Sequence, residues 1–191
     1  WLRPTLTPGS GNIGGRKLPA AFGMPADVFA QSPDTLRQVV ADPLVQALRT
    51  EPDALRALVD VTLEWLKGTE GSGATRRILS LADAGYPSSL LETPDPPLML
   101  YLLGAPGFDL APLDRSIAMV GSRNPTAQGV ETAHAFARAF GEAGIPVVSG
   151  LALGIDAAAH EGALAAAQGS GRLATVAVVG TGLDRVYPAR H

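Results

Sequence analysis

Cysteine is absent from the 191-residue sequence, which excludes disulfide bonds, thiolate metal sites and a cysteine nucleophile, and fits a reducing compartment. The three histidines lack the spacing of metal ligands, which argues against a metal centre. No apolar run reaches the roughly 18 residues that a membrane span needs, and the amino end shows no basic-then-apolar signal layout. We therefore expect a cytoplasmic protein with no metal and no cofactor, whose sequence begins at Trp1 within a longer chain.

An excess of basic charge is also missing, since the formal net charge is −3. Residues 112–191 hold six Lys and Arg against six Asp and Glu, so they lack the basic stripe of a duplex-DNA binder. A single-strand binder can rely instead on helix N-termini and a few arginines in a groove. The composition therefore permits nucleic-acid binding without predicting it.

What the sequence does have is a repeated pattern of apolar run, glycine turn and helix in its carboxyl half. Each apolar run ends in small residues, and each helical stretch stops at a glycine or a polar turn. This alternation is typical of a parallel α/β sheet. It predicts strands at 117–120, 147–149 and 174–179, helices at 126–143 and 155–167, and adjacent, parallel pairing of the first two strands.

The turns after these strands form the candidate ligand site. Loops at the carboxyl ends of parallel strands line the ligand crevice, and helices that begin there direct free N–H groups and a positive dipole end toward it. Two such turns with one arginine predict a phosphate site, although the glycines could instead serve only to make tight turns. The candidate residues are Gly121, Ser122, Arg123, Ser149, Gly150 and Gly154.

Two familiar nucleotide motifs are missing from these turns. The first turn does not read G-x-G-x-x-G and the second strand ends in Ser149-Gly150 rather than an acidic residue, which argues against NAD. No G-x-x-x-x-G-K-[ST] string is present, which argues against a P-loop.

Asp156 and His160 are four residues apart in one expected helix and therefore share a face. Such a pair could transfer protons, but no nucleophile is tied to it by sequence. The favoured interpretation is structural, with Asp156 capping the helix N-terminus and His160 packing beside it.

The amino half carries helical patterns up to the glycine-rich stretch 68–73. Pro25, Pro33 and Pro52 stand where first helical positions are expected, with caps at Ser32 and Thr50. The longest helix is expected to bury one face, with Trp65 in the core rather than serving as a base-stacking platform. That face comprises Leu55, Leu58, Val59, Leu63 and Leu66. Two strands at 78–81 and 98–103 are expected to extend the parallel sheet at an edge.

Three strings carry a resemblance to a known family: MVGSRNPTAQG, VVSGLALGIDAAAHEGAL and VAVVGTGLDRVYP. They resemble the DNA-processing protein A family (DprA, also called Smf). The resemblance implies a non-enzymatic protein that binds single-stranded DNA and loads the RecA recombinase on it during natural transformation. It also implies an α/β protein with an amino-terminal helical domain of the SAM or helix-hairpin-helix type, here 1–72, whose Gly11-Asn12-Ile13-Gly14 resembles the hairpin of such modules. An extended Rossmann-like DNA-binding domain would occupy 73–191.

The resemblance adds residues to the site and sets its limits. Asp156, Gly180 and Gly182 fall within the matching strings, and Arg172 falls near a position where the family often carries a basic DNA contact. Family members form homodimers and continue past His191 with further strands and a winged-helix-like tail, so we expect the sheet to be incomplete. An alternative is an enzyme of the Rossmann-like phosphoribohydrolase type, but its P-G-G-x-G-T loop and catalytic glutamate are absent.

Overall fold

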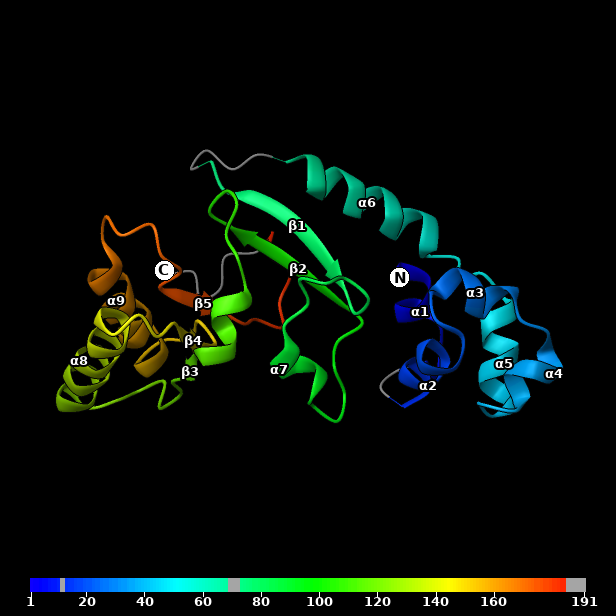
Figure 1. Ribbon diagram of the computed structural model, residues 1–191, viewed down its shortest axis with the longest axis horizontal. Helices are drawn as coiled ribbons and strands as arrows, with labels where there is room; N and C mark the ends of the chain where they lie inside the picture. Colours follow the sequence, from blue (N-terminus) through cyan, green and yellow to red (C-terminus); the bar gives the residue numbers. More distant parts are fainter. Residues whose placement is uncertain (11–12, 69–72, 185–191) are drawn as a thin grey trace. The chain divides into compact units, whose positions relative to one another are not determined.

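The computed structural model describes residues 1–10, 13–68 and 73–184. The chain divides into two compact units, Trp1–Gly107 and Phe108–His191, whose elements are labelled in Figure 1. The predicted domain boundary after residue 72 differs from this division, which places the first two strands with the helices. The boundary at 72 stays a prediction, because close packing does not by itself define an independently folding domain.

Six helices precede the first strand of the first unit, and four of them enclose an aliphatic core. Their bounds are α1 Leu2–Leu6, α2 Ile13–Phe22, α3 Pro25–Ala30, α4 Pro33–Arg37, α5 Asp42–Arg49 and α6 Leu55–Lys67. Side chains from α2 to α5 form this core, with Phe22, Phe29 and Val40 packed against it. Its buried members are Leu18, Val28, Leu36, Leu44, Val45 and Leu48.

Two of the three predicted helix starts are confirmed. Pro25 and Pro33 occupy the first positions of α3 and α4, and the Oγ of Ser32 accepts a hydrogen bond from the Thr35 N–H at 3.2 Å. The start at Pro52 is wrong. Helix α6 begins at Leu55, and Thr50 instead ends α5, where its N–H donates to the Ala47 carbonyl.

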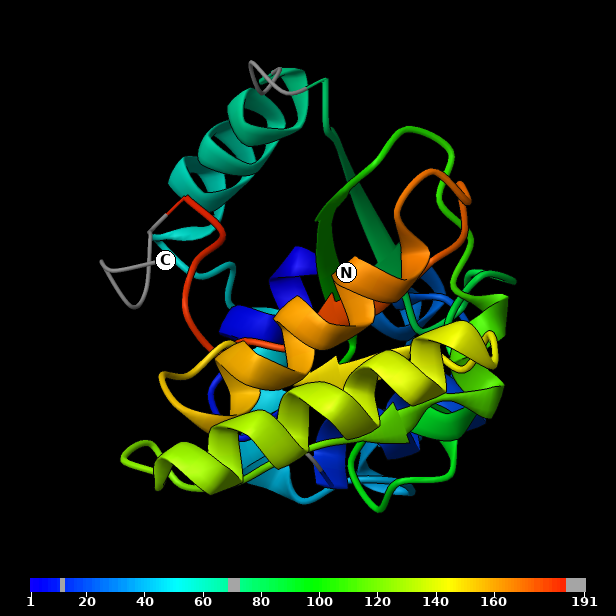
Figure 2. The ribbon, with the colours of Figure 1, turned by 90° about the vertical axis from the view of Figure 1, so that its left-hand side faces the viewer.

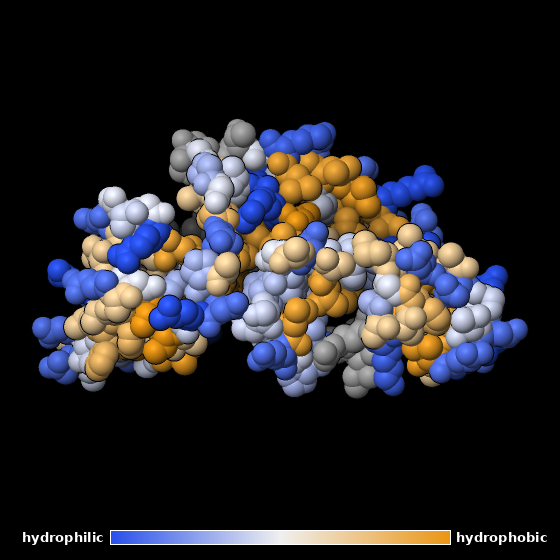
Figure 3. All heavy atoms as spheres, in the orientation of Figure 1, coloured by the Kyte–Doolittle hydropathy of each residue, from blue (hydrophilic) through white to orange (hydrophobic). Residues whose placement is uncertain are grey.

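Helix α6 buries the expected face in part, because Leu55, Leu58 and Val59 are partly buried. Leu63 and Leu66 are exposed, whereas Thr62 is buried beside Tyr101. Trp65 is partly buried and meets the Tyr101 ring edge-on, with 5.4 Å between centroids. Thr62 lies four residues after Leu58 and three after Val59, within the expected face, whereas Leu63 at the margin of that face is exposed. Figure 3 shows the resulting hydrophobic surface on α6.

The two strands of the first unit pair with each other. β1 (Thr75–Ser80) and β2 (Met99–Gly104) run antiparallel, with Thr75 opposite Gly104 and Ser80 opposite Met99. The short helix α7 (Ser88–Leu91) lies in the connection between them. The expectation that they extend the parallel sheet is wrong for the described residues, which hold two separate sheets. Neighbouring strands in the sequence pair locally here, and the apolar pattern does not encode this partner choice.

The second unit contains the predicted parallel sheet. After the 3₁₀ turn η1 (Ala111–Arg115) come β3 (Ile117–Ala118), α8 (Ala127–Glu142), β4 (Val147–Ser149), α9 (Ile155–Ala167) and β5 (Thr175–Ala177). The strand order is β3-β4-β5, and both pairings are parallel, with Ile117 opposite Val147 and Val147 opposite Thr175. The predicted adjacency of the first two strands is confirmed. Its signals were local: Thr126 caps α8, and Gly144, at φ 73°, follows its end.

Helices α8 and α9 lie side by side on one face of this sheet (Figure 2). Right-handed crossovers between strands in sequential order place both helices on the same face. Their contact is close because glycines face the neighbouring helix. A Cβ at Gly141 would lie 2.7 Å from the Ala166 Cβ, and one at Gly162 would overlap the His134 carbonyl oxygen. Ala137, Val147, Ala159 and Ala163 form the buried core between helices and sheet.

Among the described residues, no helix is long and apolar enough to cross a membrane.

Candidate phosphate site at the carboxyl ends of the strands

Three turns follow the carboxyl ends of the parallel strands and therefore lie at the same edge of the sheet. They comprise residues 119–125 after β3, 150–154 after β4 and 178–182 after β5. Most of the predicted site residues lie in them. Arg123 is the one charged residue of the three turns.

The first two turns pack directly against each other. Gly121 faces the side chain of Ile155, which a Cβ would approach to 2.7 Å. Gly154 has φ 86°, and a Cβ there would overlap the Ser122 carbonyl oxygen, which accepts the Ile155 N–H at 3.1 Å. The close packing of the two turns therefore requires glycine at both positions, whether or not a ligand also approaches the backbone there.

The carboxylate of Asp156 stabilises the second turn. This residue is 7% exposed and lies in the first turn of α9. Its Oδ2 accepts the Gly150 N–H at 3.1 Å and the Ala152 N–H at 3.3 Å, while Leu151 between them adopts a left-handed backbone with φ 61°. Asp156 was expected to cap the N-terminus of its own helix. Its carboxylate instead accepts hydrogen bonds from the turn that precedes this helix. A phosphate at these two amides would have to displace that carboxylate.

Ser149 and His160 also have their polar atoms engaged inside the unit. The Ser149 hydroxyl donates to the Met119 carbonyl at 2.7 Å and ties β4 to β3. The Thr175 hydroxyl donates its proton to the Val147 carbonyl. The Nδ1 of His160 lies 2.7 Å from the Thr175 Oγ1, so in this second hydrogen bond the histidine is the donor and the hydroxyl oxygen the acceptor. Asp156 and His160 bond different partners, the carboxylate a backbone N–H of the preceding turn and the Nδ1 the hydroxyl of Thr175.

The first turn presents its charged side chain outward. The Ser122 Oγ accepts the Asn124 N–H at 3.1 Å, and the Thr126 Oγ1 accepts the Gly129 N–H at 3.1 Å, which opens α8. Arg123 is exposed and forms no hydrogen bond or ion pair with any described residue. An exposed guanidinium beside the N-terminus of a 16-residue helix is suited to an anion.

The third turn and Arg172 stand apart from this arrangement in different ways. Gly180 and Gly182 are exposed, and a Cβ at Gly180 would meet nothing within 4 Å. Arg172 lies at the opposite end of the sheet, where its Nη2 is 3.5 Å from the carbonyl of Gly141 near the end of α8. The structure therefore does not bring Arg172 together with the other predicted residues.

Sequence reasoning missed the apolar side chains at this edge. Val120, Leu153 and Val178 are exposed on the three turns. The signal that could have found them is register, because residues at equal distances past paired positions of parallel strands come side by side.

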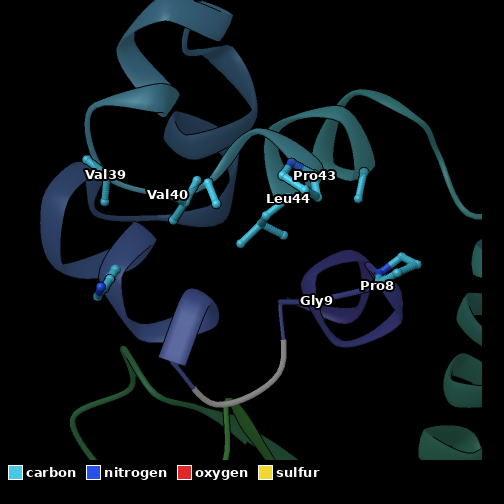
Figure 4. Close-up of a pocket in the computed structure, with 9 residues that line it drawn as sticks. Pro8, Gly9, Val39, Val40, Pro43 and Leu44 are labelled. Carbon is cyan, nitrogen blue, oxygen red and sulfur yellow. The ribbon is translucent and has the colours of Figure 1, made fainter.

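The first unit contains a cavity of about 520 Å³, shown in Figure 4, that none of the predicted site residues line. Its walls are mainly aliphatic, including Val39, Val40 and Leu44, and Lys17 is the one charged residue among the described residues that line it. No group of His, Cys, Asp and Glu side chains within the described ranges could hold a metal ion.

Comparison with known proteins gives a consistent result. The family model described as DNA recombination-mediator protein A matches residues 77–191, more than half of the chain. Protein Smf of Synechocystis is 38% identical over 60% of this chain and 28% of its own length. DNA processing protein DprA of Streptococcus pneumoniae is 41% identical over 57% of this chain and 36% of its own length. The chain thus spans well under two thirds of these relatives.

A solved structure agrees. The X-ray structure of DprA from Streptococcus pneumoniae is similar with a TM-score of 0.67 and 26% identity, covering 98% of this chain and 59% of that one.

Proposed function

The chain belongs to the DNA recombination-mediator protein A family, and we propose that it binds single-stranded DNA at the turns that follow β3, β4 and β5. The main support for this proposal is the position of Arg123. It is the one charged residue of these turns, and it is exposed and without a partner among the described residues. Its guanidinium can bond a backbone phosphate that the N–H groups of the first turn also contact. Gly121 and Ser122 shape that turn.

The second turn supports this site without offering all of its amides. Asp156 already accepts the N–H groups of Gly150 and Ala152. We therefore assign the principal phosphate contact to the first turn and give Asp156, Ser149 and Gly154 the role of fixing its neighbour. Gly180 and Gly182, both exposed, leave the third turn accessible to the same strand, whereas Arg172 would contact DNA only at the other end of the sheet.

The test is Arg123→Ala, with single-strand affinity measured at several salt concentrations. Loss of one charge-assisted phosphate bond should weaken binding by about 1.5–3 kcal/mol. It should also reduce the salt slope by about 0.7, the value for one phosphate of a single strand. The matched control is Arg56→Ala, since the Arg56 side chain is 91% exposed on α6 and its ion pair with Glu51 is long, at 3.9 Å. Equal affinities and slopes for Arg123→Ala and the parent would contradict the assignment.

The wider role of the intact protein is inferred from its family. We infer that the sheet belongs to an extended Rossmann-like domain, that residues 1–72 form a helical domain, and that the intact protein dimerises and loads RecA on single strands during DNA uptake. The relatives named DNA processing protein support DNA as the substrate. Loading would be measured as RecA-dependent ATP hydrolysis on DNA coated with a single-strand-binding protein. A protein that binds DNA through Arg123 yet does not accelerate this hydrolysis would keep the binding role and lose the loading role.

A further inference from the structure

The hydrogen bonds between β3 and β4 change partners at the carboxyl end of β4. Up to this point the pairing is regular, and the Ile117 N–H donates to the Pro146 carbonyl at 3.0 Å. The Met119 N–H follows the same pattern and donates to the Val148 carbonyl at 2.9 Å. In a parallel ladder, a residue that donates to one position accepts from the residue two positions further along the same strand. The regular donor to the Met119 carbonyl would therefore be the N–H of Gly150.

Two side chains replace that regular bond. The hydroxyl of Ser149, a residue only 4% exposed, donates to the Met119 carbonyl at 2.7 Å. The Gly150 N–H donates instead to the Oδ2 of Asp156 at 3.1 Å. The carbonyl thus keeps the donor that a buried backbone group needs, while the chain after Ser149 leaves β3. β4 still pairs with β5 here, because the Val178 N–H donates to the Ser149 carbonyl at 2.9 Å.

The position of Arg123 depends on the backbone next to this exchange. Its side chain is exposed and bonds no described residue, so the path of its turn, residues 119–125, decides where the guanidinium lies. Two carbonyls of that turn accept hydrogen bonds from the segment that runs from β4 into α9. The first is the carbonyl of Met119, which is bonded by the Ser149 hydroxyl. The second is the carbonyl of Ser122, which accepts the N–H of the first residue of α9 at 3.1 Å.

Ser149 is connected to both of these bonds. It is itself the donor in the first bond. It affects the second bond because it leaves the Gly150 N–H available to Asp156. That carboxylate stabilises the turn before α9 and directly follows Ile155 in the sequence, whose N–H bonds the Ser122 carbonyl. One buried hydroxyl therefore helps to fix the first turn at its start and beside its arginine.

We propose that Ser149 is a positioning residue for single-stranded DNA, whose hydroxyl aligns the turn that presents Arg123 to a backbone phosphate. This inference rests on the proposed function and adds the bond that orients the phosphate contact. The hydroxyl is buried and already donates to Met119, so Ser149 acts through Arg123 and not by contact with the DNA. Without the hydroxyl, the Gly150 N–H is the regular backbone donor that can replace it, which draws the second turn toward β3 and away from Asp156.

A double-mutant cycle tests this inference with four proteins: the parent, Ser149→Ala, Arg123→Ala and the combination of both changes. Affinity for a deoxythymidine oligonucleotide is measured at several salt concentrations, and folding is checked by circular dichroism. Ser149→Ala should weaken binding roughly five- to tenfold, within the range for coupled groups. It should also lower the salt slope toward that of Arg123→Ala. When Arg123 is already replaced, the serine change should have no further effect on affinity.

Thr175→Val is the matched structural control. The Thr175 hydroxyl also donates to a strand carbonyl at 2.7 Å, that of Val147, but at the amino end of the same sheet. Its loss should lower stability and leave the affinity and salt slope of the parent unchanged. Ser149→Thr retains the hydroxyl and should bind as the parent does. If Ser149→Ala does not fold, Ser149→Cys takes its place in the cycle, because a thiol is a weak donor of similar shape.

Three results would overturn the inference while leaving the phosphate contact in place. The first is an equal loss of affinity from the serine change with and without Arg123, which would show that the two residues act independently. The second is a folded Ser149→Ala or Ser149→Cys protein with the affinity and salt slope of the parent. The third is an equal loss in Thr175→Val, which would reflect sheet stability in general. Binding that does not respond to Arg123→Ala would instead refute the proposed function, and this inference with it.

Discussion

Asp156 shows how one residue can stabilise a candidate site while its own side chain is engaged with the protein backbone. Its carboxylate is buried and accepts two N–H groups of the turn that precedes its own helix. Leu151 lies between those amides with φ 61°, a conformation that costs a non-glycine residue energy and persists only where neighbours impose it. The string GLALGID predicted a turn with an acid nearby. It did not say whether the acid points outward to a ligand or inward to the backbone, because that depends on the path of the turn.

We expect Asp156→Ala to destabilise the protein by about 1.5–3 kcal/mol, the range for hydrogen bonds to a charged group. The physical reason is that two buried N–H groups lose their acceptor. Chemical denaturation followed by circular dichroism measures the change. Asp60→Ala is the control, because the side chain of Asp60 is exposed on α6 and bonds no described residue, and its effect should stay within about 0.5 kcal/mol. If both variants unfold at the same denaturant concentration as the parent, the two hydrogen bonds contribute nothing to stability.

At the scale of elements, local signals predicted the helices and strands of the second unit, and only long-range packing decided the rest. Thr126 and Gly144 marked the ends of α8 because capping is a property of a few neighbouring residues. The pairing of β1 with β2 was mispredicted and the buried face of α6 was predicted only in part, since both depend on which distant surface is available. The exposure of Val120 could have been predicted from register, but only once the strand order was known.

Glycines in the α8–α9 contact give the sharpest prediction at this scale. Gly162→Ala should destabilise the protein by about 1–3 kcal/mol, the usual cost of overpacking, because the new methyl would overlap the His134 backbone carbonyl and force the helices apart. The midpoint and slope of urea unfolding measure it.

The control for this change is Gly129→Ala in α8, where the closest atom to the new methyl is the Thr126 Oγ1 at 3.3 Å. The higher helix propensity of alanine, worth about 1 kcal/mol, should largely offset that tight contact. A Gly162→Ala protein as stable as Gly129→Ala would show that the two helices can separate at no cost.

At the scale of the whole molecule, the charge distribution limits how DNA can be bound. The net charge is −3 and the three turns carry a single charged side chain, so the general field of the protein does not attract a polyanion. The binding proposed above would therefore have to come from local groups, namely the guanidinium of Arg123 and the N–H groups at the start of α8. Such a site contacts few phosphates, and its affinity should depend on salt less steeply than that of a basic protein.

The same arrangement leads us to expect no chemical turnover. General acid–base catalysis needs a side chain free to exchange a proton with a substrate. The carboxylate of Asp156 is bonded to backbone amides and the Nδ1 of His160 to Thr175. The turns themselves hold no histidine, aspartate or glutamate. Incubation with nucleoside monophosphates, ATP or single-stranded DNA should therefore yield neither free base nor phosphate, measured by chromatography and by phosphate release.

If a small amount of product is detected, its source must be identified before it contradicts this expectation. Asp156→Asn keeps one oxygen as an acceptor for the turn but removes the acid, so a folded Asp156→Asn protein tests the carboxyl group alone. Product that persists in this variant at the parent's rate would come from a contaminating enzyme or from another site. Product that disappears in the folded variant, while single-strand affinity is retained, would make Asp156 a catalytic acid or base and the protein an enzyme.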